Sequence, residues 1–225
     1  MDPVIRNILD VAVAEFAEHG LAGARVDAIA ARTRTSKRML YYHFGSKEGL
    51  YAAALADAYA GVRTALEQPD YESLPPAAAL GTYVGHLFDL HLKSPQFVRL
   101  VMGENLLRGR FIDSIESVRQ ISHRSLETLA RIVQRGQRSG EFRSNLEPLD
   151  IYANIVGLSF HFVSNRQTFS ALFEAGADPQ AVVQRRRAVI IDTIDRQIRT
   201  DTAAGLACRP GAPAWQNGEP AGHRP

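Results

Sequence analysis

The 225-residue sequence predicts an all-α protein of about nine helices, with a small N-terminal domain and a larger C-terminal one. Apolar residues recur at steps of three and four along most of the chain, which is the spacing of a helix with one buried face. Alternating apolar and polar residues, the mark of a half-buried strand, do not compete with this pattern. The segment 69–76, PDYESLPP, is typical of a linker and separates two helical regions.

Four helices are predicted in residues 1–66. The first has about 17 residues and ends at Gly20, because glycine is a common helix stop. The second covers residues 26–33. Ser36 is placed to cap a third helix, and Ser46 a fourth that continues to about residue 66. The N-terminal domain is therefore expected to span residues 1–66.

Five further helices are predicted in a second domain, residues 77–201. They cover residues 77–93, 95 to about 105, 111–138, 148–165 and 180–200. The helix that begins at Pro148 is apolar nearly all round, so it needs burial on more than one side. The tail, residues 202–225, is rich in Gly and Pro and lacks periodicity, and we expect it to be disordered.

Composition narrows the cellular setting. The chain is 45% hydrophobic, enough for a substantial core, yet it has no run of 18 apolar residues, so no membrane span is expected. Its N-terminus is acidic and amphipathic, unlike a secretory signal. A single cysteine, Cys208, excludes a disulfide within the chain and a cysteine metal cluster. These features predict a cytoplasmic protein.

Positive charge is concentrated in residues 25–47. This segment holds six basic residues against one acidic residue, whereas the formal net charge of the whole chain is +2. Such a local excess favours a polyanionic partner. In the helix after Ser36, Leu40 and Phe44 share one face, and Arg38 and Tyr42 project from the other. Two short helices joined by about three residues form a helix-turn-helix, whose second helix fits the major groove of DNA.

The run IAARTRTSKRMLYYHFGSKEGLY, residues 29–51, resembles the DNA-binding domain of the tetracycline-repressor (TetR) family. The family pattern is approximately TxxxIAxxAGVSxxxLYYHFxxKExL, and the resemblance covers roughly residues 2–62. It implies a sequence-specific, DNA-binding transcriptional regulator, most simply a repressor that a small-molecule effector releases from double-stranded operator DNA.

The resemblance also implies the residues that meet DNA. Lys37, Arg38 and Met39 lie where the family reads bases. Tyr41, Tyr42 and His43 lie where it contacts phosphates or groove edges, and Lys47 where it holds a phosphate. Two positions depart from the pattern. Arg25 replaces a capping Thr, so the cap of the second helix must come from another residue, and the Arg25 side chain is expected to reach a phosphate. Arg34 replaces a Gly, a residue that favours a left-handed backbone.

For the larger domain, the resemblance implies an effector pocket and a homodimer through the last two helices. The pocket candidates are Phe88, Phe97, Met102, Leu106, Phe160 and His161, with His86, His91, Asn105 and His123 as further polar points. The candidates for the dimer interface are Val183, Ile190, Ile194 and Ile198.

Other chemistry finds no support in the sequence. His86 and His91 are five residues apart and have no acidic neighbour in a zinc-binding spacing, so no metal and no cofactor are expected. Phosphate-binding loops, nucleophile elbows and paired carboxylates do not stand out, and the chain is not expected to be an enzyme. Two alternatives stay open: a regulator of the same fold without a small effector, and a helical enzyme with an incidental helix-turn-helix.

Overall fold

The structure is a computed structural model that describes residues 1–66 and 69–200, with only the backbone for residues 63–66. The described residues form ten α-helices and one short 3-10 helix. In chain order these are α1 (Pro3–Gly23), α2 (Val26–Thr33), α3 (Lys37–Phe44), α4 (Lys47–Leu66), α5 (Pro76–Lys93), α6 (Pro95–Leu106), η1 (Ile112–Ser114), α7 (Glu116–Arg138), α8 (Pro148–Ser164), α9 (Arg166–Phe173) and α10 (Pro179–Ile198).

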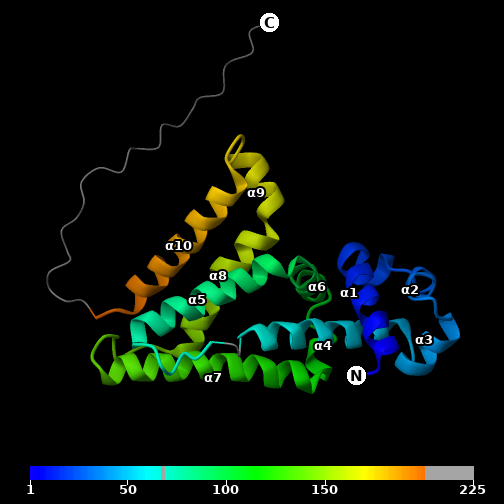
Figure 1. Cartoon of the computed structure of the whole chain (residues 1–225), viewed down its shortest axis with the longest axis horizontal. Coiled ribbons are helices and arrows are strands. Elements are labelled where there is room, and N and C mark those ends of the chain that lie inside the picture. Colours follow the sequence, from blue (N-terminus) through cyan, green and yellow to red (C-terminus); the bar gives the residue numbers. More distant parts are fainter. Residues whose placement is uncertain (67–68, 201–225) are drawn as a thin grey trace, which may run out of the picture.

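Helices α1 to α3 and the first half of α4 form a small unit at one end of the molecule, which we call the head (Figure 1). Its core joins apolar residues of all four helices, among them Ile8, Phe16, Ile29, Leu40 and Leu50. Because two of these helices have only eight residues, they depend on this shared core for their stability.

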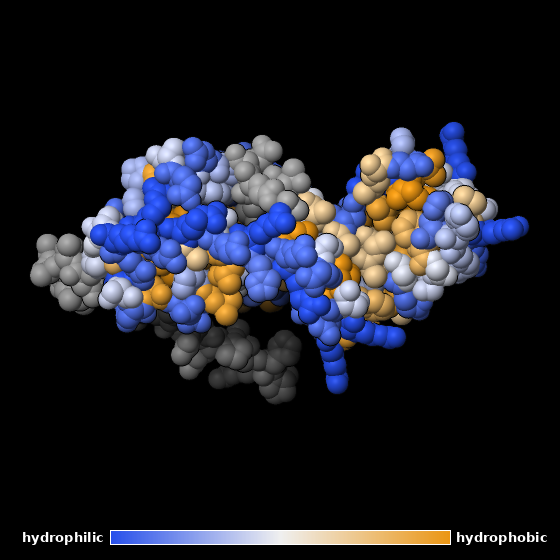
Figure 2. Space-filling model, turned by 90° about the horizontal axis from the view of Figure 1, so that it is seen from below, coloured by the Kyte–Doolittle hydropathy of each residue, from blue (hydrophilic) through white to orange (hydrophobic). Residues whose placement is uncertain are grey.

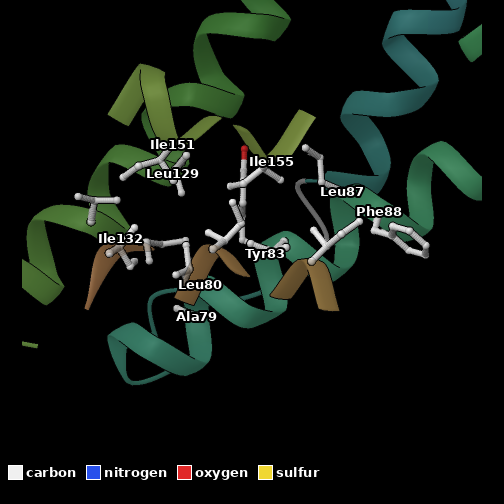
Figure 3. Close-up of a cluster of buried hydrophobic side chains, with 14 of the residues drawn as sticks. Ala79, Leu80, Tyr83, Leu87, Phe88, Leu129, Ile132, Ile151 and Ile155 are labelled. Atoms are coloured by element: carbon white, nitrogen blue, oxygen red, sulfur yellow. The ribbon is translucent and has the colours of Figure 1, made fainter. Parts of the chain in front are cut away.

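The body comprises α5 to α10 and has its own core between α5, α7, α8 and α10. Figure 3 shows part of that core, including Leu80, Tyr83, Leu129 and Ile155. Tyr83 is buried, and its hydroxyl donates to the Ser125 backbone carbonyl at 2.9 Å, so the polar end of the ring has a partner.

Two helices connect the head and the body. Helix α4 runs from the head into the body (Figure 1), with Leu50 in the core of the head and Val62 packed against the core of the body. Helix α6 lies against α1 and supplies Leu100 to the core of the head. Helices α4 and α6 therefore connect the core of the head to the body.

The structure differs from the sequence-based prediction in two helices. Helix α9 was not predicted, although Phe169 and Phe173 show the four-residue spacing of a helix face. The predicted start of the long helix at Phe111 is wrong, because the chain first makes the turn η1 and α7 begins at Glu116. Gly20, predicted as the end of the first helix, is a kink inside α1: its φ is 64°, and the helix continues to Gly23. The tail, 202–225, lies outside the described residues.

Candidate nucleic-acid interface and internal cavity

Helix α3 presents a basic and aromatic face to solvent. The Ser36 side chain accepts from the Met39 backbone N–H at 3.2 Å, which fixes the start of the helix. Leu40 is buried in the head, whereas Arg38 is exposed and the Tyr42 side chain is 79% exposed. Figure 2 shows hydrophilic side chains projecting from this end of the molecule. A tyrosine this exposed contributes little to folding and is available for contact.

The turn between α2 and α3 contains the departure at Arg34. Its backbone is left-handed, with φ 54° and ψ 32°. The Thr35 N–H donates to the Ala30 carbonyl at 3.1 Å, which closes the end of α2 in the way that a glycine usually does. The left-handed conformation that a glycine favours is therefore present here in a residue with a Cβ, at a steric cost.

The start of α2 has a cap that the sequence did not reveal. Arg25 makes no side-chain cap, and its backbone N–H donates to Oε1 of Glu15 on α1 at 3.1 Å. Oε2 of the same buried carboxylate is 3.6 Å from the guanidinium of Arg32. Glu15 thus ties both ends of α2 to α1, while the Arg25 side chain stays exposed.

Not all the basic residues near α3 are equally free. Lys37 forms an ion pair with Asp27 at 3.2 Å, and Nζ of Lys47 donates to the Ala22 carbonyl at 3.2 Å. Arg38 makes no ion pair with any described residue. Met39, Tyr41 and His43 are exposed. Arg38 and Tyr42 are therefore the side chains of α3 that are most available for contact with a partner.

The body and the adjoining part of α4 line a partly open cavity of about 240 Å³, between α4, α5, α6, α7 and α8. Aromatic and aliphatic side chains dominate its wall, with a few hydroxyl groups and one imidazole. The lining residues are Tyr59, Val62, Leu87, Leu90, His91, Phe97, Val101, Ile121, Ser122, Ser125, Tyr152, Val156 and Phe160. A concave, mostly apolar site with few polar groups is typical of a small-molecule pocket.

His91 is the most distinctive polar residue of that wall. It is buried, and burial lowers the pKa of its imidazole to about 4, because the charged form is poorly solvated there. Its Nδ1 lies 3.0 Å from Oγ of Ser159. His91 is therefore neutral at pH 7.

Two of the six predicted pocket residues line this cavity, and four do not. Phe97 and Phe160 belong to its wall. Phe88 is core, stacked on Phe162, and Met102 and Leu106 are exposed, the latter by 86%. His161 lies on the outer face of α8, beside a separate hollow between α8, α9 and α10. Helical spacing gave no means to tell which side of each helix faces the cavity.

Three of the four interface residues predicted in the last helix, Ile190, Ile194 and Ile198, are buried within the chain itself and need correction. Ile190, Ile194 and Ile198 lie in the core of the body, and Val183 is half-buried against it, because α10 packs its apolar stripe on α5 and α8. The large apolar residues that α8 and α10 leave exposed are Leu149, Leu158 and Val189, with exposed fractions of 55%, 39% and 48%.

Among the described residues, we find no group of three or more His, Cys, Asp or Glu that could hold a metal ion. In the same part of the chain, every helix is too short or too polar to cross a membrane.

Comparison with known proteins places this geometry in a family. Residues 76–194 match the domain described as "Tetracyclin repressor-like, C-terminal domain", and residues 8–54 match "Bacterial regulatory proteins, tetR family". The HTH-type transcriptional repressor NicS of Pseudomonas putida is 32% identical over 176 residues, which are 78% of this chain and 83% of NicS. The HTH-type transcriptional repressor SCO4008 of Streptomyces coelicolor is 30% identical over 155 residues, 68% of this chain and 74% of that protein.

A solved structure gives the same result. The protein SCO4942 of Streptomyces coelicolor, described as a transcriptional regulator, has a TM-score of 0.66 at 28% identity, over 87% of this chain and 98% of that one. Its fold therefore agrees with the present one over both the head and the body. Together with the sequence matches, which include more than half of the chain in one domain, this shows that the chain belongs to the tetR family of bacterial transcriptional regulators.

Proposed function

We propose that this regulator is a dimeric repressor that binds double-stranded operator DNA through α3 and leaves it when a small molecule occupies the internal cavity. The observation that carries the proposal is the position of α6, which supplies Phe97 and Val101 to the cavity and Leu100 to the core of the head. Any movement of α6 on ligand binding is therefore transmitted directly to the head. NicS and SCO4008 are named repressors, which favours repression over activation.

Arg38 is the best placed residue for reading bases. It is the second residue of α3, and the N-terminal side chains of a recognition helix meet base edges. An arginine without an internal partner can bind the N7 and O6 of guanine with two hydrogen bonds. Lys37 and Met39 flank it for further base contacts.

The other head residues are proposed to hold the DNA backbone. Tyr41, Tyr42 and His43 follow along α3 and are exposed. Arg25 and Lys47 lie at the starts of α2 and α4, where their cationic groups can reach phosphates. Lys47 must exchange its bond to the Ala22 carbonyl for the phosphate contact.

The dimer is proposed to form through the outer faces of α8 and α10. Leu158 and Val189 supply exposed apolar surface there, and the hollow lined by Gly157, Leu158 and His161 gives the partner helices a place to pack. A four-helix bundle of α8 and α10 from two copies buries this surface. It also presents two copies of α3 to successive major grooves, roughly 34 Å apart.

An electrophoretic mobility shift assay with DNA from upstream of the gene tests the proposal. The wild-type chain should shift this DNA, and Arg38→Ala and Tyr42→Ala should weaken the shift. Arg119→Ala is the control, because Arg119 is an exposed arginine of α7, paired with Glu116, far from α3 in the sequence. Absence of any shift, or an equal loss in the control, contradicts the assignment of α3 as the reading helix.

A further inference from the structure

The cavity has an aromatic wall built around His91. The imidazole is parallel to the Phe97 ring within 4°, with 6.3 Å between the ring centroids, and meets the Phe160 ring edge-on at 5.7 Å. Tyr59 meets Phe97 edge-on at 5.0 Å. All four rings line the cavity. Rings packed in this way favour a flat aromatic guest, through stacked and edge-to-face contacts.

The hydrogen bonds of Ser159 fix the tautomer of His91. Oγ of Ser159 lies 2.7 Å from the Ile155 carbonyl and 3.4 Å from the Val156 carbonyl, which can only accept. The single hydroxyl proton of Ser159 is therefore donated to a backbone carbonyl, so the Ser159 oxygen must accept the hydrogen bond from His91. Nδ1 of His91 then carries the ring proton, and Nε2 carries a lone pair.

This lone pair is an unused acceptor. His91 is 5% exposed, and its Nε2 makes no hydrogen bond with any described residue. A ligand N–H or O–H in the cavity can donate to this lone pair, in place of a water molecule.

The remaining described wall is uncharged. Its polar groups are the hydroxyls of Tyr59, Tyr152, Ser122 and Ser125, and none of the described lining residues is a Lys, Arg, Asp or Glu. Burial raises the pKa of Tyr59 to about 12 and also raises that of Tyr152, so both phenols stay neutral at pH 7. An ionised ligand buried here lacks an opposite charge among these residues, which is costly.

We propose that the cavity binds a flat, uncharged aromatic or heteroaromatic molecule of one or two rings, whose N–H or O–H donates to Nε2 of His91. This inference rests on the proposed function only for the consequence of binding, namely release of DNA. The arginines of α6 and of the turn after it do not line the cavity: Arg99 is paired with Glu18 of α1, and Arg108 and Arg110 are exposed.

Three probes of similar shape test the proposal by calorimetric titration of the full chain. Indole has the ring N–H, benzofuran replaces it with an oxygen that cannot donate, and indole-2-carboxylate adds a negative charge. Indole should bind about 2- to 10-fold more tightly than benzofuran, the range expected from one net hydrogen bond. The carboxylate should bind more weakly than either.

Variants assign the preference to His91. His91→Phe should lower indole affinity to that of benzofuran and leave benzofuran nearly unchanged. His123→Phe, at an exposed position of α7 outside the cavity wall, should preserve the difference. If His91→Phe does not fold, nitrogen NMR of the wild-type imidazoles gives the answer: Nε2 of His91 should be unprotonated, and indole should move its signal.

The outcomes separate the two proposals. Equal affinity for indole and benzofuran, tighter binding of the carboxylate, or no binding of any probe overturns the ligand assignment. His91-dependent binding of indole that leaves the operator complex intact supports the ligand class and counts against ligand-driven release. Release of DNA by a ligand that is indifferent to His91→Phe supports the repressor mechanism and overturns the role of His91.

Discussion

Phe97 and Leu100, three residues apart on α6, face the two parts of the molecule: Phe97 lines the cavity, and Leu100 is buried in the core of the head. Nearby, the buried carboxylate of Glu104 accepts from the backbone N–H groups of Phe111, at 2.6 Å, and Ile112, at 3.1 Å. These two hydrogen bonds fix the chain that follows α6. A ligand beside Phe97 therefore meets a helix that cannot shift without disturbing the packing of α1 and α4.

The first prediction concerns coupling between the cavity and DNA. A ligand can shift the equilibrium only by its differential affinity for the bound and released states. A coupling free energy of about 1–3 kcal/mol corresponds to about 5- to 150-fold weaker operator binding, and by reciprocity operator DNA must weaken ligand binding by the same factor. Calorimetric titration of indole with and without operator DNA measures this. Equal affinities favour a regulator of this fold without a small effector.

The second prediction separates base reading from phosphate binding. Arg38→Ala should reduce the preference for operator over unrelated DNA by about 1–3 kcal/mol, because it removes a base contact. Lys47→Ala should weaken binding to all sequences alike and lower the slope of log affinity against log salt by about one. Filter-binding titrations at several salt concentrations distinguish the two. The same loss of specificity in both variants contradicts the division of roles.

The third prediction concerns Arg34. Its left-handed backbone is strained by the Cβ atom, so Arg34→Gly should raise the free energy of unfolding, by about 1 kcal/mol. Ala31→Gly, three residues earlier within α2, should instead lower it by about 0.5–1 kcal/mol. Urea denaturation compares the two variants with the wild type. A loss of stability in Arg34→Gly would show that the arginine side chain stabilises this turn.

Local signals in the sequence predicted the head well. The cap at Ser36, the buried Leu40 and the exposed Tyr42 all follow from spacing within one helix, and the structure confirms the positions of all three. Partners distant in sequence could not be predicted. Glu15 bonds to Arg25 from another helix, and His91 bonds to Ser159, 68 residues away.

The sequence also could not show which residues of the body are available for the dimer interface. Periodicity identified the apolar stripe of α10 but not what covers it, since a stripe packed on α5 and α8 and a stripe packed on a second copy look alike in one sequence. Ile190 and Ile194 proved to be core, and Val189 stays exposed. Which side of a helix is free is a property of the tertiary packing.

The fourth prediction follows from that correction. Leu158→Glu and Val189→Glu place a charge on exposed surface, so the chain should fold with near-normal stability but sediment as a monomer and lose affinity for a two-site operator. Ile190→Glu buries a charge without a partner in the core of the body and should prevent stable folding. Circular dichroism and sedimentation velocity separate these effects. Dimers that survive both surface variants would place the interface elsewhere.

The fifth prediction is a pH dependence that arises from His91. Its pKa is about 4 in the folded chain and near the ordinary 6.5 when unfolded, because burial disfavours the imidazolium. Between these values the unfolded chain binds more protons, so the free energy of unfolding falls as the pH drops from about 6.5 towards 4. Each pKa unit is worth about 1.4 kcal/mol, so the loss over the 2.5 units is at most about 3.5 kcal/mol.

Urea denaturation at pH 7 and pH 4.5 should show this loss in the wild type and in His123→Phe, and a smaller one in His91→Phe. The described groups that line the cavity with His91 include Tyr59 and Tyr152 but no carboxylate, so no described neighbour there offsets the cost of protonation. Protonation also removes the lone pair of Nε2, so the preference for indole over benzofuran should persist at pH 6 and be lost only as the pH falls through about 4, the pKa of His91 in the folded chain. An indole preference that persists at pH values where His91 is protonated would mean that another group accepts the ligand's hydrogen bond.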